Sequence, residues 1–206
     1  MLTYAGELEG AGRDEDDLAY QRDDREFRNC LLVELPNAGP AAPTAAPGDF
    51  GVTMAKLLFL SAYQKQLYDW LADSSADRFA AIAAKARKES DYHLDHASQW
   101  TVRLGDGTAQ SRERMQAAVN DIWPYTHELF EIDEVTVRLA AEGIAPTSLR
   151  PQWLDEVDVV LAEATLTRPA DGWIPTGGRR GQHTEHLSYL LAEMQVLHRA
   201  HPGARW

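Results

Sequence analysis

The segment Asp77–Leu104, DRFAAIAAKARKESDYHLDHASQWTVRL, carries the clearest signal for the fold. Its apolar and small residues recur at steps of three and four, and Gly105-Asp106-Gly107 follows at once. This spacing is typical of an α-helix with one face against a core, and glycine commonly ends such a helix. The face consists of Phe79, Ile82, Ala83, Ala86, Ser90, His93, Ala97, Trp100 and Leu104. The segment therefore predicts a helix of about eight turns.

Similar spacing on both sides of this segment predicts further helices. We expect them over residues 50–73, 111–142, 149–166 and 183–200, with a shorter one over residues 1–9. Pro124 should kink or split the helix expected over residues 111–142, because proline removes a helical hydrogen bond. No alternation of strands and helices and no internal repeat is visible. The sequence thus predicts an all-α fold, a bundle of long helices.

Two segments break the helical pattern. Residues 36–49 and 167–182 are rich in Pro, Ala and Gly and predict loops. Residues 31–35 are apolar and predict a short extended piece. With 206 residues, we expect a single domain over residues 1–206.

The composition limits the classes of molecule that the chain could bind. The formal net charge of −12 argues against nucleic acid and against an anionic membrane surface, since both need Lys and Arg. No run of 18 apolar residues and no secretory signal is visible, so we expect no membrane partner and a cytoplasmic location. Cys30 stands alone, which excludes an internal disulfide framework, and its apolar neighbours predict a buried structural thiol.

A bundle of long helices raises the question of a buried metal pair. Di-iron carboxylate sites take a Glu-x-x-His motif from each of two helices, because residues three apart share a helical face. No His of this chain has a carboxylate three positions before it. The residues at those positions are Ser90, His93, Pro124, Arg180, His183, Gln195 and His198. The chain therefore does not encode the standard site, and we expect no metal in it.

His93 leaves two interpretations open. It lies on the apolar stripe, one turn after Glu89, so it is either a hydrogen-bonded core histidine or a metal ligand. The preceding helix offers Ser61 and Lys56 on its inward face, and neither suits iron or zinc. A buried polar cluster, stabilising only if fully paired, is a further hypothesis. Its members would be Lys56, Glu89 and His93, with Glu131 or Glu134.

The most distinctive string is TGGRRGQHTEH at residues 176–186. It runs from a Gly-rich loop into a predicted helix, where backbone N–H groups with Arg179 and Arg180 could hold an anion such as a CoA phosphate. A flexible loop followed by a docking helix, with Glu185 favourable at the helix start, is the second interpretation. A partner contact through these residues and His183 is the third.

Several strings resemble the C subunit of the ring 1,2-phenylacetyl-CoA epoxidases. They are KESDYHL at 88–94, RDDREF at 22–27, LLVELPN at 31–37, LFEIDE at 129–134, TGGRRGQHTEH at 176–186 and LAEMQ at 191–195. The resemblance covers essentially the whole chain. It implies a ferritin-like subunit that lacks the first helices of its family.

The resemblance also implies a function. The chain would be the non-catalytic structural subunit of a multicomponent monooxygenase in aerobic phenylacetate degradation. It would pair with the di-iron A subunit and other subunits, in a hetero- or homo-oligomer, and bind no cofactor itself. The catalytic relatives read Lys-Glu-Glu-x-x-His where this chain reads Lys88-Glu89-Ser90-Asp91-Tyr92-His93. Ser90 thus replaces their ligand Glu, and their carboxylate on the preceding helix falls at Ser61.

Two alternatives remain at this point. The chain could be an active di-iron, ferritin-like oxygenase with a nonstandard site built from Glu89, His93, Glu131 and Glu134. It could instead be a CoA-ester-binding module that uses Arg179 and Arg180.

Overall fold

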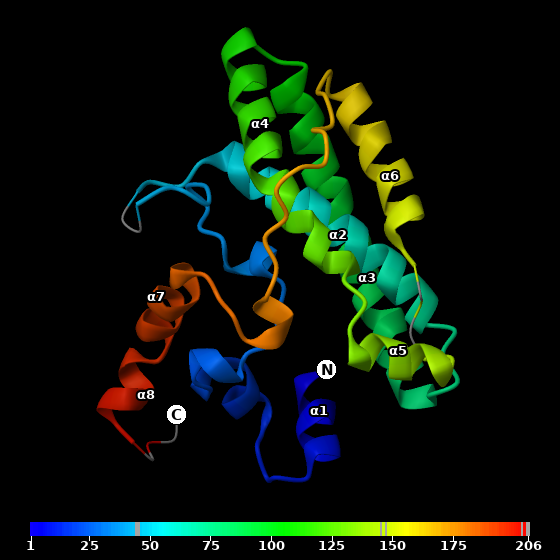
Figure 1. The fold of residues 1–206 in the computed structure, drawn as a ribbon, viewed down its shortest axis with the longest axis vertical. Coiled ribbons are helices and arrows are strands. Elements are labelled where there is room, and N and C mark those ends of the chain that lie inside the picture. Colours follow the sequence, from blue (N-terminus) through cyan, green and yellow to red (C-terminus); the bar gives the residue numbers. More distant parts are fainter. Residues whose placement is uncertain (44–45, 145, 147, 203, 205–206) are drawn as a thin grey trace. The chain divides into compact units, whose positions relative to one another are not determined.

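A computed structural model describes residues 1–43, 46–144, 146, 148–202 and 204, and within these residues every regular element is a helix. The α-helices are α1 (Leu2–Glu9), α2 (Phe50–Leu71), α3 (Asp77–Gly105), α4 (Ala109–Ile122), α5 (Glu134–Ala141), α6 (Arg150–Glu163), α7 (Glu185–Met194) and α8 (Val196–Ala200) (Figure 1). Shorter helical turns cover Asp17–Gln21, Asp24–Glu26, Leu31–Glu34, Trp123–Phe130 and Gly178–Arg180. The all-α prediction is confirmed.

The chain divides into two compact units. The central unit spans residues 36–175, and the terminal unit combines residues 1–35 with residues 176–206. Each is described by itself below. The expectation of a single domain over residues 1–206 stays a prediction.

The central unit is built on the antiparallel pair α2–α3. At one end the rings of Phe50 and Trp100 meet edge to face at 5.1 Å, and toward the other end Arg87 Nε lies 2.5 Å from Asp69 Oδ1. Helices α4 and α6 pack against both members of the pair. Because α2 has neighbours on several sides, its buried positions from Gly51 to Ala62 form a broad face over about half of the helix circumference.

An aromatic cluster fills the centre of this unit. Trp153 and Trp123 are almost fully buried, with ring centroids 5.5 Å apart, and Phe59 lies within 6 Å of both. The indole N–H of Trp153 donates to the carbonyl of Phe59 at 2.9 Å, so the buried polar atom is satisfied. Burial of these three large rings stabilises the unit, since each removes a large apolar area from water.

The predicted break at Pro124 is confirmed. Helix α4 ends at Ile122, a 3₁₀ segment covers Trp123–Phe130, and α5 begins at Glu134. Proline lacks the N–H that would continue the α-helical ladder, and its fixed φ fits the first turn of a new element. The ends of α3 and α6 meet where Gly105 lies against Ala164. A Cβ on Gly105 would stand 2.2 Å from the Ala164 carbonyl oxygen.

The segment after α6 lies along the central unit as a strap, residues 166–175. The side-chain amide of Gln116 donates to the Thr167 carbonyl at 2.9 Å and accepts from the Thr167 N–H at 2.8 Å. Further along, Asp171 accepts hydrogen bonds from Trp123 and Arg150. The strap therefore has ordered hydrogen bonds although it carries no helix.

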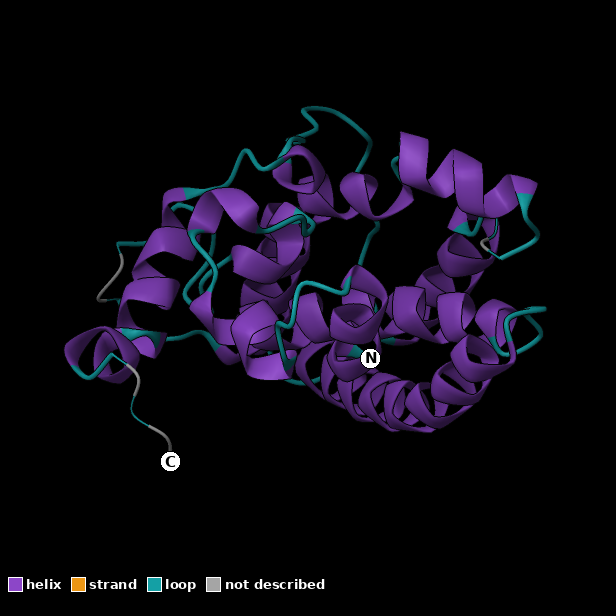
Figure 2. Ribbon diagram, turned by 90° about the horizontal axis from the view of Figure 1, so that it is seen from below, coloured by secondary structure: helices purple, strands orange, loops and turns teal. Residues whose placement is uncertain are grey.

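In the terminal unit, the prediction of an extended piece at residues 31–35 is wrong. Leu31–Glu34 forms a 3₁₀ turn in which the Val33 N–H donates to the Cys30 carbonyl at 3.1 Å. A lone extended segment would have no neighbouring strand for its backbone groups, whereas the turn satisfies one of them internally. The predicted helix over 183–200 divides into α7 and α8 at Gln195 (Figure 1). In Figure 2 the described parts of the chain are drawn as helices and loops, with no strand among them.

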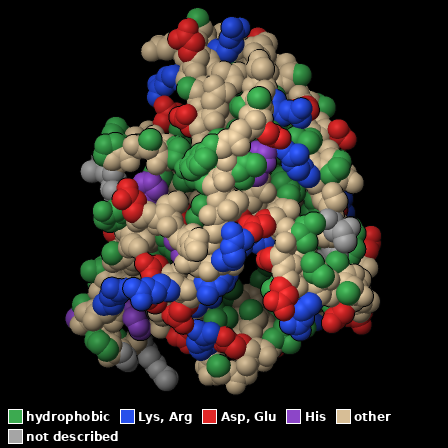
Figure 3. Space-filling model, in the orientation of Figure 1, with side chains coloured by type: hydrophobic (Ala, Val, Ile, Leu, Met, Phe, Trp, Pro, Cys, Tyr) green, Lys and Arg blue, Asp and Glu red, His purple; other side chains and the backbone are tan. Residues whose placement is uncertain are grey.

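None of the described helices is long and apolar enough to cross a membrane. On the face shown in Figure 3, acidic and basic side chains are interspersed.

Candidate functional site

The two serines that stand at the expected metal positions are buried in the central unit. Ser61 on α2 is 1% exposed and Ser90 on α3 is 3% exposed. Since residues 50 and 69 of α2 meet residues 100 and 87 of α3, the two serines lie within about one helical turn of the same height. Both occupy the interior of the α2–α3 region.

Each serine hydroxyl is satisfied inside its own helix. Ser61 donates to the carbonyl of Leu57, and Ser90 donates to the carbonyl of Ala86 at 3.2 Å. This bond to the carbonyl one turn earlier is common for serine in helix interiors. Neutral hydroxyls engaged in this way do not fit a di-iron centre, which needs several carboxylate and imidazole ligands.

Glu89 and His93 lie outside this buried position. Both side chains are exposed, so the interpretation of His93 as a core histidine is wrong. The buried residues of α3 are Ala83, Ser90, Leu94, Ala97, Thr101 and Gly105. His93 is one residue from Leu94, so its side chain points about 100° away from that of Leu94 around the helix axis, at the edge of the buried stripe.

The residues proposed as a polar cluster are not gathered in one buried place. Lys56 is partly buried on α2, where its ammonium donates to Asn37 Oδ1 at 3.3 Å and burial lowers its pKa. Glu131 is partly buried after the 3₁₀ segment, whereas Glu134 is exposed in the first turn of α5. Because Glu89, His93 and Glu134 are all exposed, a closed cluster of these side chains does not form.

Across the residues that the structure describes, no three His, Cys, Asp or Glu side chains are grouped so that they could hold a metal ion. The nonstandard set of Glu89, His93, Glu131 and Glu134 is thus not assembled. Whether the chain binds iron in solution stays a prediction.

A polar cluster that the sequence analysis missed surrounds Asp171 on the strap. Its carboxylate accepts from Trp123 Nε1 at 3.2 Å and from Arg150 at 2.8 Å, and His127 Nε2 lies 3.3 Å away. The hydrogen bond from Arg150 holds the pKa of Asp171 below its usual value, and burial lowers the pKa of His127. No local spacing could have revealed this cluster, because its members come from three separate segments.

The Gly-rich string of residues 176–186 lies in the terminal unit and packs against its N-terminal half. Gly177 and Gly181 adopt φ values of 125° and 82°, which favour glycine. A Cβ on Gly178 would lie 2.3 Å from the Asn29 carbonyl oxygen, and one on Gly181 would lie 2.4 Å from Arg28 Nη1. The glycines therefore permit a close approach of two segments far apart in the sequence.

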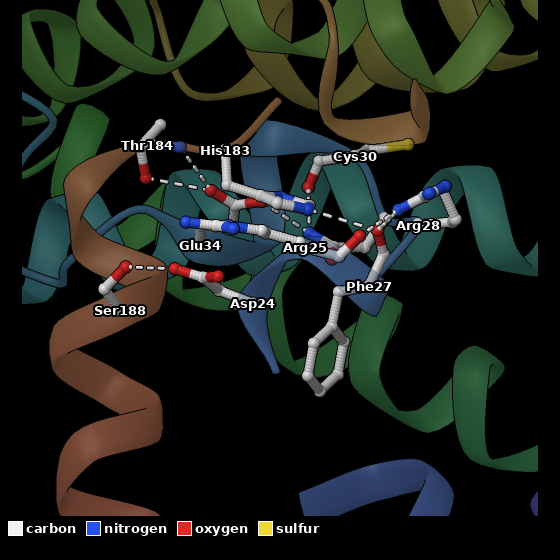
Figure 4. Close-up of polar contacts among 10 residues, drawn as sticks. Asp24, Arg25, Phe27, Arg28, Cys30, Glu34, His183, Thr184 and Ser188 are labelled. Carbon is white, nitrogen blue, oxygen red and sulfur yellow. Dashed lines mark hydrogen bonds and ion pairs between the residues drawn. The ribbon is translucent and has the colours of Figure 1, made fainter. Parts of the chain in front are cut away.

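The two segments are joined at a buried carboxylate (Figure 4). Glu34 Oε1 accepts from Asn29 Nδ2 at 2.7 Å and lies 2.5 Å from His183 Nδ1. Glu34 Oε2 accepts from both the backbone N–H and the hydroxyl of Thr184, each at 2.9 Å. The side chain of Glu34 is 1% exposed and that of His183 is 7% exposed. We call Asn29, Glu34, His183 and Thr184 the Glu34 clasp.

The clasp changes the interpretation of the predicted anion site. Thr184 is the N-cap of α7, so the start of this helix already holds an anionic group, the Glu34 carboxylate. Arg179 is partly buried, Arg180 is exposed with Nη2 3.5 Å from Thr176 Oγ1, and Glu185 is exposed in the first turn of α7. A CoA phosphate at this loop stays a prediction, but it would have to bind beside the helix start and not on it.

The fold and these positions define a class of protein. Long antiparallel helices around an aromatic core, with Ser61 and Ser90 buried inside the α2–α3 pair, are those of a ferritin-like helical bundle. Comparison with known proteins agrees: residues 1–206 match the family model described as phenylacetic acid catabolic protein.

The chain belongs to this family, and its role lies in phenylacetate catabolism. It is similar to the C subunit of 1,2-phenylacetyl-CoA epoxidase from Escherichia coli (strain K12), with 46% identity over 208 residues. That alignment covers 100% of this chain and 79% of the relative. The resemblance and the ferritin-like fold stated from the sequence are thereby confirmed.

Proposed function

We propose that this chain is the non-catalytic structural subunit of a cytoplasmic 1,2-phenylacetyl-CoA epoxidase, that it pairs with the di-iron A subunit, and that it binds no iron itself. The observation that carries the proposal is the pair of buried serines, Ser61 and Ser90, with hydroxyls bonded to their own helices. We name this enzyme because the chain is similar to a relative named as the C subunit of such an epoxidase.

The electrostatics of the bundle interior favour this proposal over an active oxygenase. A buried di-iron site needs carboxylates whose charge is offset by the metal ions, and without metal such carboxylates are costly to bury. At the two serine positions this chain instead buries neutral groups with satisfied hydrogen bonds. At Ser61 and Ser90 there is therefore no buried charge for a metal ion to neutralise. This favours a structural role for the subunit.

Co-expression with the cognate A subunit tests the proposal. Size-exclusion chromatography of the mixture should give one complex, and iron analysis should show iron in the A subunit alone and in the complex, in proportion to the A subunit. Purified alone and reconstituted with Fe(II), this chain should retain less than stoichiometric iron. A stoichiometric di-iron centre in the isolated chain would contradict the proposal, and so would failure of the two chains to co-elute.

A matched pair of variants separates the structural subunit from an active oxygenase. In the assembled complex, the Glu89→Ala, His93→Ala double variant should leave epoxidation turnover unchanged, since both side chains are exposed and outside any metal cluster. Glu113→Ala on the exposed face of α4 is the control for a surface change. A selective loss of turnover and iron in the first variant would favour the nonstandard site instead.

A further inference from the structure

The strap, residues 166–175, contains an Asp-Gly pair, Asp171-Gly172. In such a pair the backbone nitrogen of the glycine can attack the side-chain carboxyl carbon of the aspartate, because glycine has no Cβ to hinder the approach. A carbon–nitrogen bond forms, water leaves, and the product is a five-membered succinimide ring. Hydrolysis of the ring at the original backbone carbonyl takes up water again and leaves isoaspartate. The reaction needs no oxidant and no cofactor, so the local conformation decides where it occurs.

A second Asp-Gly pair in the sequence, Asp106-Gly107, has a backbone that is held in place. Asp106 is the C-cap of α3, and its N–H donates to the Val102 carbonyl at 2.8 Å. A Cβ on Gly107 would stand 2.7 Å from the Arg103 carbonyl oxygen and 3.0 Å from Ser111 Oγ, so this glycine lies tightly between α3 and the start of α4. Rotation of the Gly107 nitrogen onto the Asp106 carboxyl group would break these contacts.

The backbone at Asp171-Gly172 is not restrained in this way. Both residues are exposed, and residues 168–175 make no backbone–backbone hydrogen bond within the part of the chain that the structure describes. A Cβ on Gly172 would meet no heavy atom within 4 Å. The fixed part of this pair is the side chain of Asp171, which accepts hydrogen bonds from Trp123 and Arg150.

These hydrogen bonds oppose the reaction while the strap is closed. Trp123 Nε1 donates to Oδ1 of Asp171 at 3.2 Å and Arg150 donates to Oδ2 at 2.8 Å, so the carboxyl group must leave both donors before the glycine nitrogen can reach it. A carboxyl group also loses water more easily when protonated, and the hydrogen bond from Arg150 holds the pKa of Asp171 below its usual value. Both side chains of the Arg150–Asp171 pair are partly exposed to water, so this link is weak. The strap should therefore open transiently, as weakly packed surface segments do.

We propose that Asp171 is a site of isoaspartate formation that reacts when the strap opens, and that the product can no longer close the strap. In isoaspartate the main chain runs through the side-chain methylene, so it is longer by one carbon. The free carboxylate is then attached directly to Cα and has lost the methylene that carries it to Trp123 and Arg150. Asp171 thus acts as a one-way latch: its conversion leaves the strap detached from the 3₁₀ segment and from the start of α6.

The first test is to age the full chain at neutral pH and physiological temperature in oxygen-18 water. Ring opening adds oxygen-18 to the chain, and mass spectrometry of proteolytic peptides locates the label and distinguishes isoaspartate from aspartate. Isoaspartate should accumulate at Asp171 and stay at background level at Asp106. Equal or faster accumulation at Asp106, or none at Asp171, overturns the proposal. This comparison needs only the unaltered protein.

Two substitutions should change the rate at Asp171 in opposite directions. Arg150→Gln removes the ion pair and should raise the rate about two- to fivefold, the range that a partly exposed ion pair supports. Gly172→Ala fits the open space around this residue, so it should slow the reaction without disturbing the fold, because its Cβ hinders the attacking nitrogen. Arg112→Gln, exposed on α4, is the matched control for loss of a surface arginine and should leave the rate unchanged. The same rate in the unaltered chain and in all of these variants overturns the proposal.

The indole N–H groups show whether the product releases the strap. In the isoaspartate form, separated by ion-exchange chromatography, the NMR signal of the Trp123 indole N–H should shift and exchange faster with water, because its bond to Asp171 is lost. The indole N–H of Trp153, which donates to the Phe59 carbonyl, is the internal control and should be unchanged. An unchanged Trp123 signal would mean that the strap closes again after the reaction, which overturns the one-way latch.

Discussion

The two units of the chain are stabilised in different ways. The central unit is organised around a buried aromatic cluster of Phe59, Trp123 and Trp153, and it also buries Glu128 and several hydroxyl groups. The terminal unit depends on side chains that bond to backbone and carboxylate groups, as at Glu34 and at Gln195, whose amide donates to the carbonyls of Tyr20 and Arg22. The centre of one unit is a cluster of aromatic rings, whereas the two segments of the other unit are joined by hydrogen bonds from polar side chains.

The two units therefore differ in how strictly they require particular residue types. Apolar burial is non-directional, so many residue combinations of similar volume satisfy it. A hydrogen-bonded clasp needs a particular donor or acceptor at each place, and the glycines beside it must lack a Cβ. The strings RDDREF, LLVELPN and TGGRRGQHTEH, which carried much of the resemblance, lie largely in the terminal unit.

The sharpest test of the comparison is Trp153→Ala in the central unit. This change removes a fully buried ring and its hydrogen bond to Phe59, and it should lower the free energy of unfolding by about 3–5 kcal/mol. Urea denaturation followed by near-ultraviolet circular dichroism measures it. Trp173→Ala, at a ring that is 69% exposed, is the control and should cost less than about 1 kcal/mol. Equal costs for the two would contradict an aromatic core.

A smaller and more local effect is expected for Gln195→Ala in the terminal unit. The buried amide satisfies two backbone carbonyls, and its loss should cost about 1–3 kcal/mol. Hydrogen exchange should show the loss of protection within residues 1–35 and 176–206, with the central unit unchanged. Glu193→Ala, at an exposed position of α7 two residues before Gln195, is the control and should have no such effect. If protection falls equally in both units, the two units do not unfold independently of each other.

The smallest effect is expected at Asp49, the N-cap of α2. Its carboxylate accepts from the backbone N–H groups of Gly51 and Val52 and pairs with Arg114, so Asp49→Ala should cost about 1–2 kcal/mol. Arg114→Ala leaves the cap in place and should cost less than about 1 kcal/mol, because this ion pair is largely exposed. Thermal unfolding of both variants gives the ranking, and a reversed ranking would mean that the ion pair outweighs the cap.

The contribution of Asp49 to the stability of the fold should also depend on pH. Burial acts to raise its pKa, but the hydrogen bonds from Arg114, Gly51 and Val52 more than offset this, so the pKa lies below the usual value. A carboxyl with a lowered pKa stabilises the fold above its unfolded pKa, and this stabilisation is lost as the pH falls through the folded pKa. The stability difference between the unaltered chain and Asp49→Ala should therefore shrink on acidification, as acid titration of both would show.

Much of the central unit could be predicted from the sequence. The start of α2, most of α3 and the break at Pro124 follow from apolar spacing and from the chemistry of proline, both of which act locally. The exposure of His93 could not be predicted, because His93 and Leu94 both continue a plausible apolar stripe and only packing against neighbouring helices decides between them. Apart from Leu94, the buried residues of α3 are small, whereas Phe79, Ile82, Trp100 and Leu104 are not among them.

The Glu34 clasp and the Asp171 cluster were beyond sequence reasoning for another reason. Glu34 meets Thr184 across a separation of 150 positions, and Asp171 meets Trp123 across 48. Hydrophobic periodicity reports the environment of one element at a time and says nothing about such pairs. The Gly-rich string did mark an unusual backbone, but its use as a close approach to Asn29 and Arg28 depends on the second segment.

The discontinuous make-up of the terminal unit has a consequence for how the chain folds. The central unit is one continuous stretch, residues 36–175, whereas the terminal unit joins residues 1–35 to residues 176–206. During synthesis Glu34 stays hydrated until residues 183 and 184, which enclose it in the folded chain, have left the ribosome. Contacts of such long sequence separation are slow to form, since the loop entropy is lost before the contacts can compensate. The terminal unit should thus be the last part of the molecule to fold and the most dependent on protection from chaperones.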